Sequence, residues 1–206
     1  MSKRCIIISG GEYAPVEGLR PDDFVIACDR GYLYAKGQGI VPDLLVSDYD
    51  SYDGPVDQRV SVERFRPEKD DTDTMIAVRY ALQHGYDELL LFSALGGRLD
   101  HTLANLQAIV YAQAHGARAA IYAADSRVYT LSRGSLRLPR LPGWSLSVIA
   151  AQDRCTGLSI HGAKYPLEDA ELTNSFPLGI SNEWVSDEAE ISVRDGIVLV
   201  VLSKLG

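Results

Sequence analysis

The stretch LLLFSALGGRLDHTLANLQAIVYAQAHGARAAIY, residues 89–122, decides the fold of the first part of this chain. It begins with an uninterrupted apolar run, Leu89–Phe92, continues with a helical pattern over 100–115 that Gly116 ends, and returns to an apolar run at Ala119–Tyr122. Uninterrupted apolar runs are typical of strands buried on both faces of a parallel sheet. A strand, a helix and a second strand make one βαβ unit, which predicts a doubly wound α/β domain.

The same alternation extends toward the N-terminus. Further buried strands are predicted at Cys5–Ile8, Phe24–Cys28, Leu44–Val46 and Val60–Phe65. Helices are predicted over 30–38 and 73–84, between these strands. In the helix over 100–115, the spacing of Leu103, Leu106 and Val110 predicts the stripe that faces the core.

The helical pattern disappears after residue 125, where short apolar runs alternate with turn residues. The pair Asp195-Gly196 lies between Ala189–Val193 and Ile197–Leu202, and such a pair predicts a β-hairpin. We therefore expect a mostly parallel, doubly wound α/β domain over 1–125 and a small all-β sandwich domain over 126–206.

Composition limits the class of protein. The chain has 206 residues, a formal net charge of −8 and a pI near 5.0, which argues against a nucleic-acid binder. No apolar run approaches the ~20 residues needed to span a bilayer, and Cys5–Ile8 is too short for a signal-peptide core. The cysteines Cys5, Cys28 and Cys155 lack metal-ligand spacing and are expected to be buried thiols. These features predict a cytoplasmic protein that binds neither membrane nor nucleic acid.

Polar clusters follow four of the predicted strands. They are Asp29, the pair Asp48 and Asp50, the group Asp70, Asp71 and Asp73, and the segment Gly96-Gly97-Arg98-Leu99-Asp100-His101. Each cluster alone is typical of a turn or a helix cap. Because ligands of open α/β sheets bind at the carboxyl ends of the strands, four clusters at these ends favour a single site.

The residue types in these clusters indicate metal-assisted phosphoryl transfer. Carboxylate oxygens suit Mg²⁺, the Gly96-Gly97 turn can present backbone N–H groups to a phosphate, and Arg98 can neutralise a transferring group. There is no Walker A loop. Two alternatives use the same residues. Asp48-Tyr49-Asp50 after an apolar strand resembles the nucleophile motif of haloacid-dehalogenase-type phosphatases, and a non-catalytic nucleotide-binding module is also compatible.

The ordered set of motifs resembles the thiamine pyrophosphokinase family over nearly the whole chain. The matching segments are Asp29-Arg30-Gly31, Pro42-Asp43, Ser47-Asp48-Tyr49-Asp50-Ser51, Lys69-Asp70-Asp71-Thr72-Asp73, Gly96-Gly97-Arg98-Leu99-Asp100-His101, Ala104-Asn105, Ala163-Lys164-Tyr165-Pro166-Leu167 and Ser181-Asn182-Glu183. Two residues depart from the family pattern, since Arg30 and Ser47 each stand where a glycine is common. The family's Gly-Leu before Lys-Tyr corresponds either to Gly157-Leu158 or to Gly162-Ala163, and we favour the second because Lys164-Tyr165 follows it directly.

The resemblance implies transfer of the pyrophosphoryl group of ATP to the hydroxyl of thiamine, giving thiamine diphosphate and AMP. It implies a homodimer in which the β domain of the partner completes each site. Asp48, Asp50, Asp73 and Asp100, assisted by Asp70, would hold Mg²⁺, and Asp48, Asp73, Asp100 and Arg98 would be catalytic. ATP and its phosphates would be bound by Asp29, Ser51, Lys69, Gly96, Gly97 and Arg98. Thiamine would be bound by Tyr165, Ser181 and Asn182. A pyrophosphokinase acting on a hydroxymethylpterin is the nearest alternative, because it needs similar phosphate chemistry.

Overall fold

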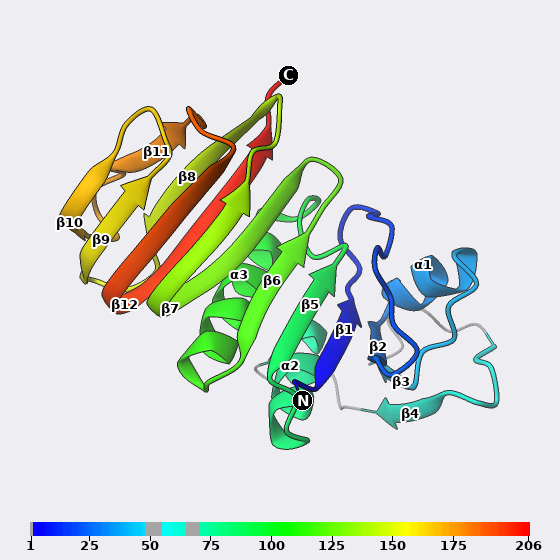
Figure 1. Ribbon diagram of the computed structural model, residues 1–206. Coiled ribbons are helices and arrows are strands. Elements are labelled where there is room, and N and C mark those ends of the chain that lie inside the picture. The colour runs from blue at the N-terminus through cyan, green and yellow to red at the C-terminus, as the bar shows by residue number, and fades with distance from the viewer. Residues whose placement is uncertain (1, 48–54, 65–70) are drawn as a thin grey trace. The chain divides into compact units, whose positions relative to one another are not determined.

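The computed structural model describes residues 2–47, 55–64 and 71–206, and divides the chain into two compact units, Met1–Ala124 and Asp125–Gly206. Unit 1 holds β1 (Arg4–Ile8), β2 (Phe24–Cys28), α1 (Gly31–Gly37), β3 (Leu44–Ser47), β4 (Ser61–Arg64), α2 (Asp73–Gln83), β5 (Glu88–Phe92), α3 (Leu99–Ala114) and β6 (Arg118–Tyr122) (Figure 1). Unit 2 holds β7 (Ser126–Pro139), β8 (Trp144–Ala150), β9 (Cys155–His161), β10 (Leu167–Leu172), β11 (Gly179–Asn182) and β12 (Glu188–Lys204).

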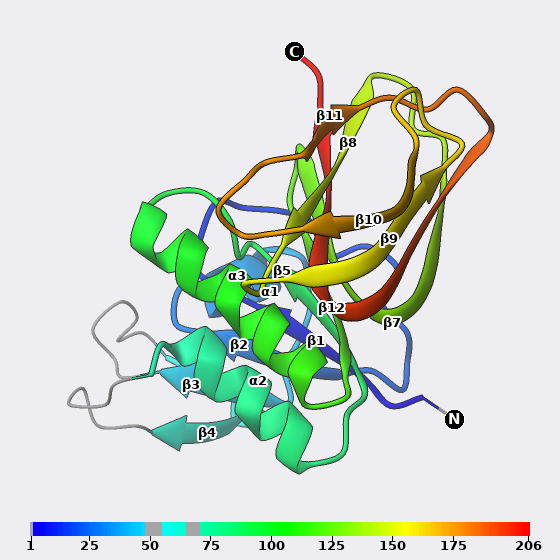
Figure 2. The same ribbon diagram turned by 90° about the vertical axis from the view of Figure 1, so that its left-hand side faces the viewer.

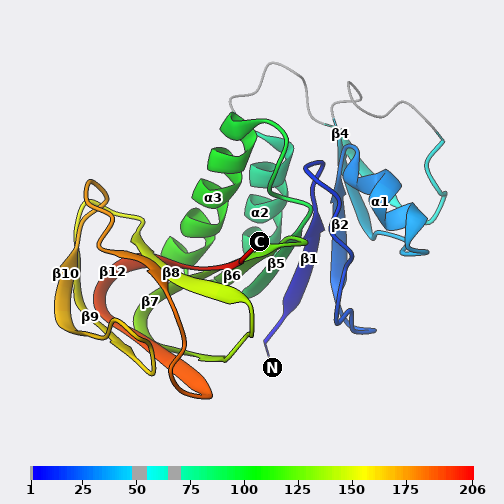
Figure 3. The ribbon, with the colours of Figure 1, turned by 90° about the horizontal axis from the view of Figure 1, so that it is seen from above.

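Unit 1 is built on a parallel sheet with the strand order β6-β5-β1-β2-β3-β4. In β1, Ile6 pairs with Val25 of β2 on one side and with Leu90 of β5 on the other. Helix α1 covers one face of this sheet, and α2 and α3 cover the other (Figure 3). The order of the strands along the chain reverses beside β1, which is the position where open α/β sheets bind ligands.

The strands of unit 1 are buried because helices cover both faces of the sheet. Every residue of β1 is buried, from Arg4 to Ile8. On the α1 side, Ile6, Ile8, Val25 and Phe92 pack in one cluster with Ala35 of α1. The uninterrupted apolar runs in the sequence therefore correspond to a parallel sheet, as predicted.

Helix α3 buries the predicted stripe only in part: Leu106 and Val110 are half-buried, and the prediction was wrong for Leu103. Leu103 is 52% exposed, and the buried residues of α3 are Asn105, Ala108, Ile109 and Ala112. These residues have helical spacing as well, and three of them are small or short. Small side chains allow a helix to approach its neighbours closely, so the face with less apolar surface became the packed one.

Unit 2 consists of antiparallel strands, three of which pair with the long strand β12. The first half of β12 pairs with β9 and the second half with β8, while β7 pairs along both halves (Figure 2). Strand β10 pairs with β9 and β11 pairs with β8; neither β10 nor β11 was predicted. The core of this unit includes Leu146, Leu158, Ile160, Ile191, Val198 and Val200.

The predicted hairpin at Asp195-Gly196 was also wrong, because β12 runs through this pair without turning back. Val193 and Ile197 of β12 face Gly134 and Ser132 of β7. Three residues separate the first two, but only Arg133 separates the second two. This irregularity is a β-bulge, which bends a strand without ending it. Gly196 has φ +99°, and a Cβ there would lie 2.7 Å from the Sγ of Cys155, so the close approach requires glycine.

The three cysteines are free and buried, as expected. Burial raises the pKa of the Cys5 and Cys28 thiols, because the thiolate is poorly solvated there. In the described parts of the chain, no helix has both the length and the apolar character required to cross a bilayer.

A buried ion pair joins β1 to the residue before β2. Arg4 Nε donates to Asp23 Oδ1 at 2.7 Å, and the side chains of Arg4 and Asp23 are 9% and 1% exposed. Arg4 also donates to the carbonyl of Gly18 at 2.6 Å, and Asp23 accepts from the backbone N–H of Arg20 at 2.7 Å. The pair lies at the amino ends of β1 and β2, away from the ligand edge of the sheet.

Candidate functional site

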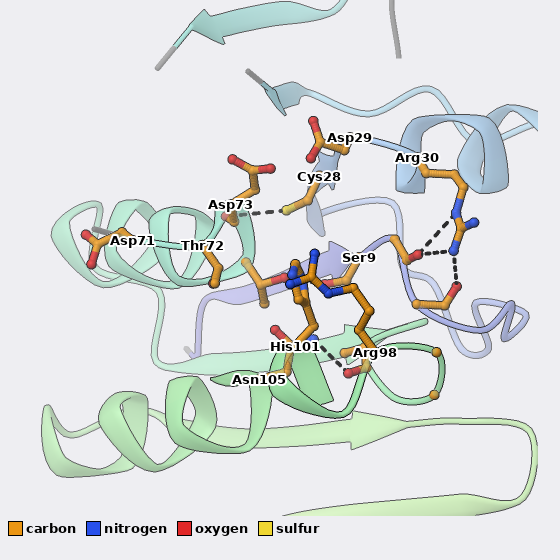
Figure 4. Close-up of a pocket in the computed structure, with 16 residues that line it drawn as sticks. Ser9, Cys28, Asp29, Arg30, Asp71, Thr72, Asp73, Arg98, His101 and Asn105 are labelled. Atoms are coloured by element: carbon orange, nitrogen blue, oxygen red, sulfur yellow. Dashed lines mark hydrogen bonds between the residues drawn. The ribbon is translucent and has the colours of Figure 1, made fainter. Parts of the chain in front are cut away.

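A cavity of about 770 Å³ lies at the carboxyl ends of β1, β2 and β5 in unit 1 (Figure 4). Its lining comes from the loops after these strands and from the first turns of α2 and α3. The lining residues are Ser9, Gly10, Gly11, Cys28, Asp29, Arg30, Asp71, Thr72, Asp73, Thr74, Ala94, Gly96, Gly97, Arg98, His101 and Asn105. The cavity is therefore at the edge where the acidic clusters were predicted to meet.

The loop after β1 forms one wall and is bonded to the loop after β5. The N–H of Gly11 donates to the carbonyl of Ser93 at 2.7 Å, and that of Glu12 donates to Leu95 at 2.8 Å. A Cβ on Gly11 would lie 2.5 Å from the carbonyl oxygen of Leu95. Only glycine permits this approach, so the Gly10-Gly11 pair brings bare backbone to the cavity.

Asp29 occupies the end of β2 in the left-handed region, at φ +44°. The Oγ of Ser47 donates to Asp29 Oδ1 at 2.6 Å, and the N–H of Asp29 donates to the carbonyl of Val46 at 3.0 Å. Ser47 is buried at the end of β3. Its hydroxyl therefore holds one carboxylate oxygen of Asp29 in a defined orientation, which a glycine at this position could not do.

The N-terminus of α2 contributes Asp73 to the same cavity. Thr72 caps the helix by accepting the N–H of Met75 at 3.2 Å, and Asp73 is the first helical residue. The thiol of Cys28 donates to the backbone carbonyl of Asp73 at 3.6 Å, which ties α2 to the end of β2. In Figure 4 the side chains of Asp29 and Asp73 lie on the same side of the cavity.

The segment Gly96-Gly97-Arg98 leads into α3. Gly96 and Gly97 have φ values of +80° and +69°, so both use a conformation that favours glycine. Arg98 donates to both carboxylate oxygens of Asp100, at 3.1 and 2.6 Å. The hydrogen bond from Arg98 lowers the pKa of Asp100, so this carboxylate stays charged. The two predicted catalytic groups are therefore paired with each other, and Asp100 is not among the lining residues.

The donor set of the described lining suits Mg²⁺. Asp29 and Asp73 offer carboxylate oxygens and Thr72 offers a hydroxyl, while the raised pKa of Cys28 keeps its thiol protonated and a poor ligand. Among residues 2–47, 55–64 and 71–206, there is no group of three metal-binding side chains. Of the proposed Mg²⁺ ligands, Asp73 and Asp100 are described; Asp73 lines the cavity, whereas Asp100 is bonded to Arg98 and does not.

Several predicted site residues lie outside the described residues, namely Asp48, Asp50, Ser51, Lys69 and Asp70. Of the described ones in unit 1, Asp29, Asp73, Gly96, Gly97 and Arg98 line the cavity, whereas Asp100 does not. Six further lining residues were not predicted as site residues, although the last two occur in the matching family segments: Ser9, Gly10, Gly11, Thr74, Arg30 and Asn105. A signal was available for the first three, because Ser9-Gly10-Gly11 directly follows a predicted strand.

In unit 2, Tyr165 is 60% exposed and its backbone is held by one buried amide. The N–H of Tyr165 donates to Asn182 Oδ1 at 3.0 Å, and Asn182 Nδ2 donates to the carbonyl of Tyr165 at 2.8 Å. Lys164 Nζ lies 5.6 Å from the Tyr165 ring centroid. Trp184, in contrast, is buried and donates to the carbonyl of Leu138 at 3.3 Å. Tyr165 is thus the aromatic side chain of this segment that can meet a ligand.

Ser181 lies beside Asn182, but its backbone N–H forms a hydrogen bond with a residue of β8 and not with Tyr165. It has φ +58°, is exposed, and donates its backbone N–H to Ser147 Oγ at 3.0 Å. The structure therefore places Tyr165, Ser181 and Asn182 in one region of unit 2, with Asn182 buried as the support of Tyr165.

Comparison with known proteins assigns both units. The family model for "Thiamin pyrophosphokinase, catalytic domain" matches residues 18–121, and that for "Thiamin pyrophosphokinase, vitamin B1 binding domain" matches residues 136–198. The chain is 26% identical to the thiamine pyrophosphokinase of Bacillus subtilis over 184 residues, which cover 86% of each protein.

Solved structures agree in fold over the whole length. The crystal structure of thiamine pyrophosphokinase from Bacillus subtilis has a TM-score of 0.86 at 23% identity, covering 99% of this chain and 100% of that one. The enzyme from Geobacillus thermodenitrificans has a TM-score of 0.82 at 25% identity, covering 98% and 97%. Thiamin pyrophosphokinase from Candida albicans has a TM-score of 0.75 at 13% identity, covering 98% and 90%. On the family match, which spans half of the chain in its catalytic domain alone, this chain belongs to the thiamin pyrophosphokinase family.

Proposed function

We propose that this protein transfers the pyrophosphoryl group of ATP to the hydroxyl of thiamine, releasing AMP. The observation that carries the proposal is the cavity of unit 1, which gathers Asp29, Asp73, Gly96, Gly97 and Arg98 at the ligand edge of the sheet. The family match favours this reaction over transfer to a hydroxymethylpterin and over a haloacid-dehalogenase-type phosphatase.

In this proposal, unit 1 binds ATP with Mg²⁺ and unit 2 binds thiamine. Asp73, together with Asp48, Asp50, Asp70 and Asp100, would hold the metal, which stabilises negative charge on the phosphates. Arg98 would exchange Asp100 for a phosphate oxygen, since a charged guanidinium can form the same two hydrogen bonds with either. Backbone N–H groups of the Gly96-Gly97 turn would bind phosphate at the N-terminus of α3.

The products test the reaction class. With ATP, Mg²⁺ and thiamine, we expect thiamine diphosphate and AMP in equal amounts by mass spectrometry, because the bond between the α- and β-phosphates is broken. A hydroxymethylpterin in place of thiamine is expected to give no AMP. Formation of ADP with thiamine monophosphate, or of inorganic phosphate alone, would reject the proposal.

Tyr165 tests whether unit 2 binds thiamine. We propose that its exposed ring stacks on the cationic thiazolium, which gains about 0.5–2 kcal/mol from a cation–π contact. Tyr165→Ala is expected to raise the KM for thiamine roughly tenfold, since ~1.4 kcal/mol corresponds to tenfold.

Two controls separate binding from folding in this experiment. The KM for ATP should stay close to the wild-type value, and Tyr165→Trp should retain most activity, because it keeps an aromatic face. Since the Tyr165 side chain is mostly exposed, the alanine variant should keep the wild-type melting temperature. If the Tyr165→Ala variant is folded and has the wild-type KM for thiamine, Tyr165 does not stack on thiamine and another aromatic residue must do so.

We also propose the homodimer with shared sites that the family resemblance implies. Six apolar residues of β12, from Ala189 to Leu202, pack in the core of unit 2, while Val201 is half-buried outside that cluster. Leu178, Ile180 and Val185 are exposed apolar residues of the same unit and are available for a partner. Sedimentation at assay concentration should show a dimer, and a fully active monomer would exclude a shared site.

A further inference from the structure

Arg30 is a cation in the lining of the unit 1 cavity, at a position where the family pattern commonly has glycine and to which the sequence analysis assigned no role. It lies just before α1, directly after Asp29. Its guanidinium reaches the loop after β1, where Nε donates to the carbonyl of Gly10 at 3.1 Å and Nη2 donates to the carbonyls of both Gly10 and Gly11 (Figure 4). The guanidinium carbon also lies 5.7 Å from the centroid of the Tyr34 ring.

Among residues 2–47, 55–64 and 71–206, no carboxylate compensates the charge of Arg30. The other arginine of the lining, Arg98, is bonded to Asp100, whereas among the described residues Arg30 contacts the neutral carbonyls of Gly10 and Gly11 and the ring of Tyr34. In the described part of the chain, no acidic side chain forms an ion pair with Arg30. A guanidinium with neutral acceptors keeps its full positive charge toward the cavity.

The contacts of Arg30 also reduce the cost of binding an anion. Its side chain is held at two backbone carbonyls and against Tyr34, so fewer rotamers are lost when a ligand binds. The hydroxyl of Tyr34 donates to the carbonyl of Gly11 at 2.9 Å, which holds the same loop. Arg30 covers carbonyl oxygens whose partial negative charge would otherwise disfavour a phosphate at this wall.

We infer that Arg30 binds a phosphate group of the nucleotide, as a residue additional to Arg98 and the Gly96-Gly97 turn. This inference rests on the proposed function, because it requires ATP in the cavity of unit 1. It predicts that Arg30 contributes to the affinity for the charged part of ATP and contributes nothing to the affinity for adenosine.

The test measures binding of ATP, with excess Mg²⁺, by calorimetry, and binding of adenosine by its competition with ATP. Arg30→Gln should raise the Kd for ATP about tenfold to a hundredfold, in the range of a charge-assisted hydrogen bond, and leave the adenosine Kd unchanged. Arg30→Lys should stay within a few fold of the wild type for ATP, because it keeps the charge. Arg118→Gln is the matched control, since Arg118 is exposed at the amino end of β6, at the opposite edge of the sheet.

The outcomes distinguish phosphate binding by Arg30 from a purely structural role, in which Arg30 only holds the loop after β1 in place. A lysine cannot reproduce the forked contact with two carbonyls, so equal losses for Arg30→Gln and Arg30→Lys would show a tether and overturn the inference. The inference would also be overturned if Arg30→Gln weakened binding of ATP and adenosine equally, or if it left the affinity for ATP unchanged. Failure of Arg30→Gln to fold would overturn it too. If the wild-type protein itself binds no ATP, the proposed function fails first, which is a distinct result.

Discussion

Asp73→Asn is expected to reduce kcat about 10- to 100-fold or more while the protein remains folded. Asp73 begins α2 and lines the cavity with Asp29, and of the described members of the proposed Mg²⁺ set it is the one that lines the cavity. The amide has the same shape but no charge, so it binds a divalent cation poorly. Steady-state kinetics across a Mg²⁺ titration would show a loss that high Mg²⁺ only partly restores.

Asp22→Asn is the matched control for Asp73→Asn. Asp22 is an exposed aspartate before β2, at the amino end of the sheet, so the same change of charge occurs far from the cavity. It should leave kcat unchanged. Near-normal turnover of Asp73→Asn at saturating Mg²⁺ would mean that Asp73 serves only at the start of α2.

Asp23→Ala is expected to lower the free energy of unfolding by about 3–5 kcal/mol, because it leaves the Arg4 guanidinium buried without its counter-ion. Arg4 would retain the carbonyl of Gly18 as its acceptor, which does not neutralise the charge. Urea denaturation of the two proteins measures the difference. The double variant Arg4→Met with Asp23→Leu should recover part of the loss, since it removes both charges; no recovery would mean that Asp23 acts through another contact.

The stability conferred by Asp23 should depend on pH. Burial alone would raise the pKa of Asp23, but the hydrogen bonds from Arg4 and from the N–H of Arg20 outweigh it, and the pKa is lowered. A carboxyl group with a lowered pKa in the folded state stabilises above its unfolded pKa of ~3.9, and this contribution is lost as the pH falls further. The gap between wild type and Asp23→Ala should therefore be constant near neutral pH and narrow below about pH 4; a gap independent of pH would contradict the ion pair.

The strands and helices of unit 1 could be predicted because their signals are local. Leu89–Phe92 is a buried strand, Gly116 follows α3, and the described polar residues Asp29, Asp73 and Arg98 meet at one edge. In a parallel sheet every strand ends at the same edge, so local order along the chain implied proximity in space. For this reason Asp29, Asp73, Gly96, Gly97 and Arg98 were predicted and do line the cavity.

The tertiary structure decided the features that depend on partners distant in sequence. Asp195-Gly196 has the residues of a hairpin turn, yet β7 and β9 pair on either side of it and keep β12 continuous. Helix α3 has two apolar faces of similar spacing, and packing selected the one with small side chains.

The same division holds in the site. Three hydrogen-bonded contacts join segments that are 17 to 20 residues apart. They are the contacts of Ser47 with Asp29, of Asn182 with Tyr165, and of Arg30 with the carbonyls of Gly10 and Gly11. The sequence alone determined which residue types follow each strand, because that is a property of the chain order. It could not determine which of them pair with one another, because a hydrogen bond between separate segments forms only after the sheet has set their distance and direction.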